Sequence, residues 1–298
     1  MADWDLGQLR ALAAAADLGT FDAAARALHV TPSAVSQRIK ALEQQAGAVL
    51  LRRDRPVRPT AAGEPLVRLA RQLDALTADA TRHLAGDATA PHVTLAVNGD
   101  SLATWALPAL APLAGSIALR LVREDQERSA DLLRDGSVMG AVTSQAVAVQ
   151  GCTVEPLGVM RYRPMAAPAF VDRWFPDGPR AAALAAAPVV VFDAADRLQD
   201  RWLRRHRVDP ARPPRHLVPA SADFAAAVRL GFGWGMLPAQ QSDADERAGR
   251  LVPLTDDAVD VPLQWQQWSL RTAALDAVAD ALRAGARAAL AAPDRPTA

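Results

Sequence analysis

The sequence predicts a mainly helical N-terminal domain, a long connecting helix and a C-terminal α/β domain with two lobes. Three observations lead to this prediction. Short amphipathic helical patterns precede a basic turn at residues 52–56. A heptad-like leucine pattern then covers residues 66–83. From residue 93 onward, short apolar runs of strand type alternate with helical patterns, as in α/β domains.

The composition of the chain excludes several classes of protein. The chain has 298 residues, enough for roughly two domains, and its 33 basic and 33 acidic residues balance. A single cysteine, Cys152, cannot form an internal disulfide, and the five histidines show no metal-ligand spacing. No apolar run approaches the roughly 20 residues that span a bilayer, and the acidic start is unlike a signal peptide. We therefore expect a soluble cytoplasmic protein with no cofactor, no metal and no membrane partner.

Residues 1–59 are expected to form the first domain. An apolar stripe at residues 6–16 predicts a helix that ends at residues 17–19. Thr20 can cap a second helix, and Thr31 followed by Pro32 is a typical start for a third. Two short helices joined by a tight turn are typical of a helix-turn-helix.

The third helix and the turn after it carry the candidate DNA contacts. Residues 49–51 and Val57 predict two short strands around an arginine-rich turn, which together would form the wing of a winged helix. From Arg26 to Arg58 there are seven basic residues and two acidic ones. A solvated helix face and an ordinary basic hairpin are the alternatives. The candidates for base edges and phosphates are Thr31, Ser33, Ser36, Gln37, Arg38, Lys40, Arg52, Arg53 and Arg58.

Residues 60–90 are expected to form a linker helix and hinge. Thr60 can cap the helix, and Glu64 lies near its positive end. Apolar residues recur between Leu66 and His83 at alternating spacings of three and four. So narrow a stripe needs a partner, which predicts a dimer; packing on its own chain is the alternative.

Residues 91–298 are expected to form the two-lobed α/β domain. Lobe I takes about 91–162 and 263–298, and lobe II about 163–262. Expected strands are 93–97, 117–122, 139–142, 165–166, 189–192, 216–218, 234–237 and 263–270; expected helices begin at Ser101 and cover 132–133, 198–205, 224–230 and 275–290. Two lobes with crossing connections resemble a periplasmic-binding-protein fold, in which ligands bind between the lobes.

Polar residues that follow strand ends predict a ligand site. Ser101, at a helix N-terminus, is our candidate for binding a ligand carboxylate. Acids near other strand ends would suit the cationic groups of a basic amino acid. Helix capping and solvated loops are the alternatives for each acid, and core packing is the alternative for Trp105. The complete candidate set is Asp100, Ser101, Trp105, Glu124, Asp125, Thr143, Asp193, Ser221 and Asp223.

Several spaced motifs in residues 21–66 resemble one family in register. The segment reads FDAAARALHVTPSAVSQRIKALEQQAGAVLLRRDRPVRPTAAGEPL. It is similar to the DNA-binding domain of LysR-type transcriptional regulators. The resemblance implies binding to double-stranded promoter DNA, a homodimer that pairs into a homotetramer, and recruitment of RNA polymerase.

A narrower resemblance covers most of the chain. VNGDSLATWALPALAPL (97–113), VREDQER (122–128), GAVTSQ (140–145) and APVVVFDAADRLQDRWL (187–203) resemble the LysG/ArgP branch. This implies an activator of amino-acid export whose effector is L-lysine or L-arginine. A different small-molecule effector, or a role in inhibiting replication initiation, is the alternative.

The sequence does not favour an enzyme. It contains no nucleophile elbow, no phosphate-binding loop, no dinucleotide fingerprint and no metal-binding box. Cys152 has no histidine nearby in sequence and is better explained as a buried structural thiol.

Overall fold

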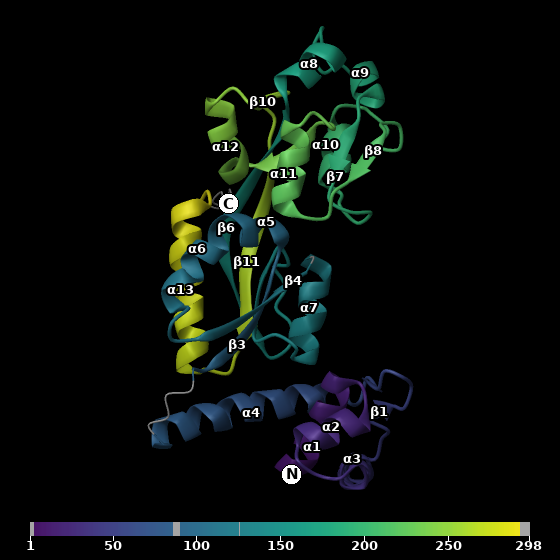
Figure 1. Ribbon diagram of the computed structural model, residues 1–298, viewed down its shortest axis with the longest axis vertical. Helices are drawn as coiled ribbons and strands as arrows, with labels where there is room; N and C mark the ends of the chain where they lie inside the picture. Colours follow the sequence, from purple (N-terminus) through teal and green to yellow (C-terminus); the bar gives the residue numbers. More distant parts are fainter. Residues whose placement is uncertain (1–2, 86–89, 125, 293–298) are drawn as a thin grey trace, which may run out of the picture.

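The computed structural model describes residues 3–85, 90–124 and 126–292, and confirms the predicted fold class. A small helical domain at the N-terminus leads into the long helix α4 (Glu64–Ala85), and the two-lobed α/β domain follows (Figure 1). No helix within these ranges is both long and apolar enough to cross a membrane.

The N-terminal domain contains three helices and a short hairpin. The helices are α1 (Leu6–Leu18), α2 (Phe21–Ala27) and α3 (Pro32–Ala46); the antiparallel strands are β1 (Leu51–Arg52) and β2 (Arg58–Pro59). Asp5, Thr20 and Thr31 cap the three helices by accepting backbone N–H groups, because their side-chain oxygens reach the otherwise unpaired first turn. The core of this domain includes Leu9, Leu12, Val35, Ile39 and Leu42.

Helix α4 begins at Glu64, four residues after Thr60. The Thr60 hydroxyl accepts from the Gly63 N–H at 3.1 Å and donates to the Val49 carbonyl at 2.7 Å, which ties the hairpin to the helix. Gly63 fits here because a Cβ atom would lie only 2.0 Å from the Leu50 carbonyl oxygen. A turn therefore occupies the residues between Thr60 and Glu64.

The apolar stripe of α4 packs partly on its own chain. Leu66, Leu69 and Leu73 contact the core of the N-terminal domain, while Leu76 is 38% exposed. Near the middle of α4, Arg71 pairs with the Asp17 carboxylate of α1 and donates to the Asp135 carbonyl at 2.6 Å. One guanidinium group thus contacts both the N-terminal domain and lobe I.

Lobe I is built on parallel strands. Strand β3 (His92–Val97) lies between β4 (Ala118–Arg123) and β5 (Gly140–Thr143). Its helical segments are α5 (Gly99–Ser101), the π-helix η1 (Leu102–Ala106), α6 (Leu107–Leu110), η2 (Ala111–Leu113), α7 (Gln126–Asp135) and α13 (Ala273–Ala289). Helices α6 and α13 cover one face of the sheet and α7 lies on the opposite face (Figure 1).

Two long antiparallel strands run through both lobes. They are β6 (Cys152–Ala166) and β11 (Val259–Trp268), paired from Cys152–Trp268 to Tyr162–Val259. The register shifts between Leu263 and Gln264, which pair with Gly158 and Pro156 and leave Leu157 as an extra residue.

Lobe II surrounds the other ends of these strands. Strands β9 (Gly235–Pro238) and β10 (Val252–Pro253) pair with β6, and β7 (Val189–Val191) pairs in parallel with β8 (Arg215–Leu217). The helices are α8 (Pro168–Trp174), α9 (Ala181–Ala186), α10 (Leu198–Arg205), α11 (Ser221–Arg229) and α12 (Ala239–Arg247). Trp202 and Trp234 are fully buried in its core, with ring centroids 4.9 Å apart.

The main difference from the sequence prediction is strand β6. The pattern predicted a strand only at 165–166, but β6 begins at Cys152. Pro156, Gly158 and the partly exposed Arg163 interrupt the apolar pattern, whereas pairing with β11 holds the segment extended. Helices α8, α9 and α12 and strand β10 were also absent from the prediction; α9 is only six residues long, and α12 is mostly polar.

Candidate functional site

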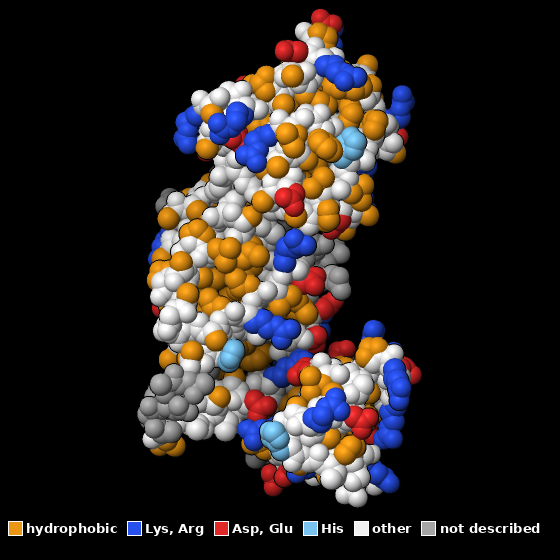
Figure 2. Space-filling view, in the orientation of Figure 1, with side chains coloured by type: hydrophobic (Ala, Val, Ile, Leu, Met, Phe, Trp, Pro, Cys, Tyr) orange, Lys and Arg blue, Asp and Glu red, His pale blue; other side chains and the backbone are white. Residues whose placement is uncertain are grey.

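The first candidate surface lies on α3 and the β1–β2 hairpin. Thr31 is exposed at the N-cap of α3; on the helix itself Ser33, Gln37 and Lys40 are exposed, while Ser36 and Arg38 are half-buried. Arg52, Arg53 and Arg58 are exposed on the hairpin. Figure 2 shows Lys and Arg side chains in a row along one edge of this domain. The arrangement offers hydroxyl, amide and cationic donors beside one another.

Two contacts fix the shape of this surface. The Thr31 hydroxyl lies 3.0 Å from the Ser33 hydroxyl and accepts from the Ala34 N–H at 3.2 Å. The Glu43 carboxylate of α3 accepts from the Leu50 N–H at 2.9 Å, which holds the hairpin against the helix. Helix and hairpin therefore form one surface.

The second candidate site is a cavity of about 510 Å³ between the lobes. Lobe I contributes residues 98–100, at the end of β3. The long strands contribute Tyr162 and Val261. Lobe II contributes the turn between β7 and α10, the end of β9, Phe224 and Gln241. The cavity thus lies at the carboxyl ends of parallel strands, where such sheets bind ligands.

Asp100 lies at the centre of a hydrogen-bond network that joins the lobes. Tyr162 donates its hydroxyl proton to Asp100 Oδ2 at 2.7 Å, and the Ser221 hydroxyl donates to Asp100 Oδ1 at 2.6 Å. Gln241 Nε2 in turn donates to Ser221 Oγ at 2.8 Å. Each carboxylate oxygen keeps accepting capacity, so Asp100 is oriented and still able to bind a cation.

A second carboxylate, Asp196, lines the same cavity. It accepts the N–H groups of Phe192 at 3.0 Å and Leu198 at 2.9 Å. Burial raises the pKa of Asp196, and the nearby charge of Asp100 raises it further. Burial, followed by the charge of Asp100, also raises the pKa of Tyr162 well above its ordinary value, which keeps its hydroxyl protonated as a donor. A bound cation would relieve the repulsion between the two carboxylates.

Three buried polar atoms of residues that line the cavity, and one atom of Ser101 beside it, have no hydrogen-bond partner within the described chain. They are Asn98 Nδ2, Ser101 Oγ, Gln199 Oε1 and Gln241 Oε1. A buried polar atom left unpaired costs free energy, so each requires an explanation. The amide nitrogen of Asn98 can donate only, which suits a carboxylate, and the two glutamine oxygens can accept only, which suits N–H groups.

The structure brings three of the candidate ligand residues together. Asp100 and Asp193 line the cavity, and Ser221 binds Asp100. Ser101 is completely buried beside the cavity, and its N–H donates to Asn98 Oδ1 at 2.8 Å.

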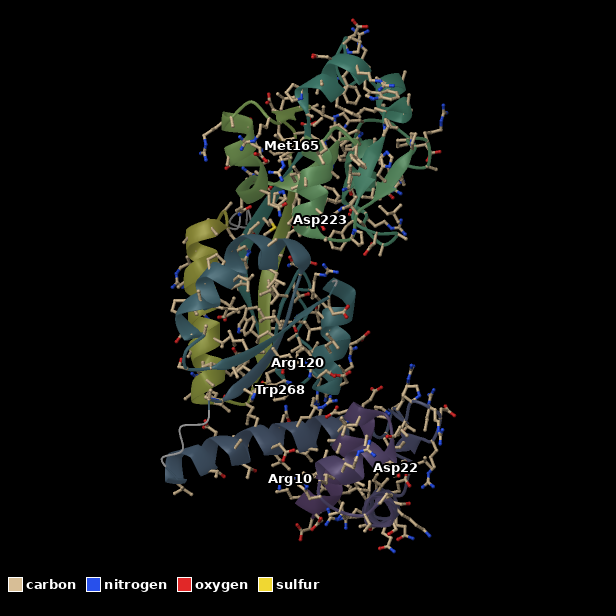
Figure 3. The ribbon with its side chains drawn as sticks, viewed as in Figure 1. Arg10, Asp22, Arg120, Met165, Asp223 and Trp268 are labelled. Atoms are coloured by element: carbon tan, nitrogen blue, oxygen red, sulfur yellow. The ribbon has the colours of Figure 1, made fainter. Side chains whose placement is uncertain are left out.

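The other candidate ligand residues do not line the cavity. Trp105 is buried in η1 and faces Gly285 of α13, and Thr143 is buried in β5. Glu124 lies beyond the end of β4, and Asp223 is exposed on α11 (Figure 3). Asp125 lies outside the described residues.

The candidate set did not include several polar residues of the cavity. Asn98 and Asp196 neighbour candidate residues and follow strands, so the same signal could have included them. Tyr162 lies within β6, and Gln241 lies in the first turn of α12, three residues after β9 ends. Their place at the site depends on how the lobes come together.

Both parts of the chain match known families. Residues 6–64 match the bacterial regulatory helix-turn-helix protein, lysR family, and residues 86–291 match the LysR substrate binding domain. The chain is 47% identical to the HTH-type transcriptional regulator LysG of Mycobacterium tuberculosis, covering 94% of this chain and 92% of that protein. It is 41% identical to the lysine export transcriptional regulatory protein LysG of Corynebacterium glutamicum, covering 94% and 98%.

Solved structures extend the comparison to the whole fold. The crystal structure of ArgP from Mycobacterium tuberculosis superposes with a TM-score of 0.91 at 44% identity, covering 98% of this chain and all of that one. Full-length LysG from Corynebacterium glutamicum with bound effector Arg gives 0.83 at 38% identity, covering 97% and 100%.

Proposed function

Because the chain belongs to the LysR family of bacterial regulators, we propose that it binds promoter DNA and a basic amino acid and controls the transcription of an amino-acid exporter gene. The relatives support both parts of the proposal. One is named a lysine export regulator, and a LysG structure is described with bound effector Arg. The effector of this chain is L-arginine or L-lysine, and no cofactor is required.

The observation that carries the effector proposal is the pair of carboxylates beside unpaired polar atoms. Asp100 and Asp196, with Asp193 at the edge, balance the α-ammonium and the side-chain cation of the amino acid. Gln199 Oε1 and Gln241 Oε1 accept N–H groups of the ligand. Asn98 Nδ2 and Ser101 Oγ donate to its α-carboxylate. Every unpaired buried atom of the cavity thereby gains a partner of matching type.

The DNA proposal rests on the exposed face of α3 and on the hairpin. Gln37, Arg38 and Lys40 reach base edges and phosphates in a major groove, while Arg52 and Arg53 contact the backbone. The part of the α4 apolar stripe that does not pack on its own chain packs against a second copy. The two recognition helices of this dimer then bind the two halves of a two-fold-related operator. Two dimers then form a tetramer, which recruits RNA polymerase in the cytoplasm.

The coupling between ligand and DNA follows from the network around Asp100. The Ser221–Asp100 and Tyr162–Asp100 bonds join lobe II and a long strand to lobe I. A ligand held by Asp100 on one side and by Asp196 on the other adds a further connection across the cavity. It therefore binds one arrangement of the lobes more tightly than another and shifts their populations.

The decisive experiment is calorimetric titration of the full-length protein with arginine, lysine, histidine and glutamate. We expect saturable binding of arginine or lysine and none of glutamate. A footprint on the promoter of a neighbouring exporter gene, with and without the ligand, tests the DNA proposal separately. Binding of glutamate, or of none of the four amino acids, would refute the effector proposal and leave the DNA proposal to the footprint.

A further inference from the structure

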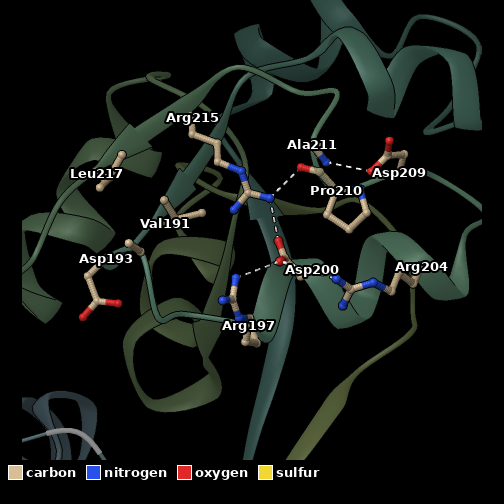
Figure 4. A pocket seen from close by; sticks show the side chains of 11 residues that line it. Val191, Asp193, Arg197, Asp200, Arg204, Asp209, Pro210, Ala211, Arg215 and Leu217 are labelled. Carbon is tan, nitrogen blue, oxygen red and sulfur yellow. Dashed lines mark hydrogen bonds and ion pairs between the residues drawn. The ribbon is translucent and has the colours of Figure 1, made fainter.

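A second cavity, of about 440 Å³, lies in lobe II beside the first (Figure 4). It is at the carboxyl ends of β7 and β8, against one face of α10. Its apolar lining comes from Val191, Pro210 and Leu217, with Leu217 58% exposed. Among its lining residues, the proposed function uses only Asp193, which borders both cavities.

Three guanidinium groups converge on one carboxylate in this cavity (Figure 4). The Asp200 side chain is buried, and Arg215 donates to its Oδ1 at 2.5 Å and to the Pro210 carbonyl at 2.6 Å. Arg197 and Arg204 lie 3.6 and 3.8 Å from Asp200 Oδ2, beyond hydrogen-bond distance, and their side chains are 66% and 59% exposed. Arg215 Nη2 thus gives both of its N–H groups to these two oxygens, while Arg197 and Arg204 retain donors for another anion.

The other two acids of the cavity accept backbone N–H groups rather than guanidinium groups. Asp193 accepts the N–H groups of the two residues that begin the next turn, Ala195 and Asp196. Asp209 accepts the Ala211 N–H at 3.0 Å. Figure 4 shows the Asp193 carboxylate pointing away from the three guanidinium groups and the Asp209 carboxylate turned toward the Ala211 N–H. The three carboxylates and three guanidinium groups of the lining therefore balance in charge, and the hydrogen-bond donors left for a ligand are those of Arg197 and Arg204, beside an apolar lining.

We propose that this cavity is a second ligand site, for a small organic acid with an apolar body. The carboxylate of the ligand accepts from Arg197 and Arg204, because charge-assisted bonds to guanidinium groups are strong and directional. The hydrocarbon body lies on Val191, Pro210 and Leu217, where it covers apolar surface. An inorganic anion would use the arginines alone.

The two cavities share lining residues, which couples them. Asp193 and Arg197 border both cavities. An acid that holds Arg197 neutralises a positive charge at the rim of the first cavity, so a cationic effector binds there more tightly. This coupling rests on the proposed effector site, and by linkage the effector tightens binding of the acid by the same factor.

The test of the site is a titration of the full-length protein with hexanoate, with hexanamide as its uncharged counterpart and sulfate as an inorganic anion. We expect saturable binding of hexanoate that is much tighter than binding of the other two. Arg204→Gln should weaken it at least about tenfold, since a charge-assisted bond is lost. Arg212→Gln removes the same charge from an exposed residue of the same loop region that does not line the cavity, and should leave binding unchanged. Equal binding of hexanamide or sulfate, equal loss in both variants, or no binding would refute the site.

The test of the coupling is the affinity for arginine with and without saturating hexanoate. We expect arginine to bind about fivefold more tightly in its presence, the lower end of common coupling factors. An unchanged or weaker affinity would refute the coupling but not the site. If arginine does not bind, the coupling is measured with lysine; failure of both to bind would refute the proposed effector, while the hexanoate titration would still decide the second site.

Discussion

Replacing Asp100 with asparagine removes one negative charge from the cavity between the lobes and keeps the shape of the side chain. Asp100 accepts from Tyr162 at 2.7 Å and from Ser221 at 2.6 Å. In Asp100→Asn one of these hydroxyl groups must turn and accept from the new amide, which a hydroxyl can do. The fold should therefore persist, and the main loss falls on the cationic ligand.

The size of that loss follows from the bond that is removed. A hydrogen bond to a charged group contributes about 1.5–3 kcal/mol. Since 1.4 kcal/mol is about tenfold in affinity, Kd for arginine should rise by roughly 10- to 150-fold. Titration calorimetry measures this directly, and thermal unfolding of the same sample checks the fold.

Asp223→Asn is the matched control for this experiment. It removes the same charge two residues from Ser221, but Asp223 is exposed and does not line the cavity. Its Kd for arginine should stay within about twofold of the unaltered protein. Equal effects of the two substitutions, or a change below about threefold in Asp100→Asn, would refute the assignment of Asp100 to the ligand cation.

Further predictions concern Asp196, the DNA surface and α4. Because the pKa of Asp196 is raised, the affinity for arginine should fall as pH decreases through that raised value, and Asp196→Asn should remove this dependence; an identical pH profile in the variant would contradict it. The native state also holds this proton more tightly than the unfolded chain, so the free energy of unfolding should decrease as pH rises through the same window. Gln37→Ala should weaken binding to the operator about 5- to 100-fold and leave ligand binding intact. Arg52→Ala should weaken binding to all DNA and reduce by about one the slope of log affinity against log salt concentration. Equilibrium DNA-binding assays across salt concentrations measure both effects, and an unchanged slope would exclude a phosphate contact of Arg52. Gly63→Ala should lower the free energy of unfolding by at least about 1–3 kcal/mol, because its Cβ would meet the Leu50 carbonyl, whereas Gly115→Ala has open space and should not; equal melting temperatures would exclude the close contact.

The N-terminal domain could be predicted because residues close together in the sequence determine where its helices begin and end. Thr20 and Thr31 form the caps that their positions predict, and Pro32 opens α3. The start of α4 is harder to predict from the sequence. Thr60 and Gly63 form a turn that contacts Leu50 and Val49, and a contact between separate segments leaves no local signal.

In the two-lobed domain, local sequence patterns predict less of the structure. Strand β6 was largely missed because its partner β11 lies about a hundred residues away in sequence, and pairing rather than composition holds it extended. The rule that polar residues after strands line a cleft found Asp100 and Asp193, but it also selected Glu124, which follows β4, and Thr143, which is the last residue of β5; neither lines the cavity. The cavity opens at the ends of β3 and β7. Which strand ends border it depends on how the two lobes pack together, and the sequence pattern does not show this.

The long pair of strands that joins the lobes also restricts how they can move. Sliding β6 along β11 would break the whole ladder between Cys152–Trp268 and Tyr162–Val259, whereas a small twist of the pair breaks none of it. The connection therefore resists sliding of one lobe past the other but allows one lobe to rotate relative to the other. A ligand that pulls on both lobes can turn one against the other but cannot displace it sideways. Such a rotation changes the angle between attached domains while leaving their distance almost constant.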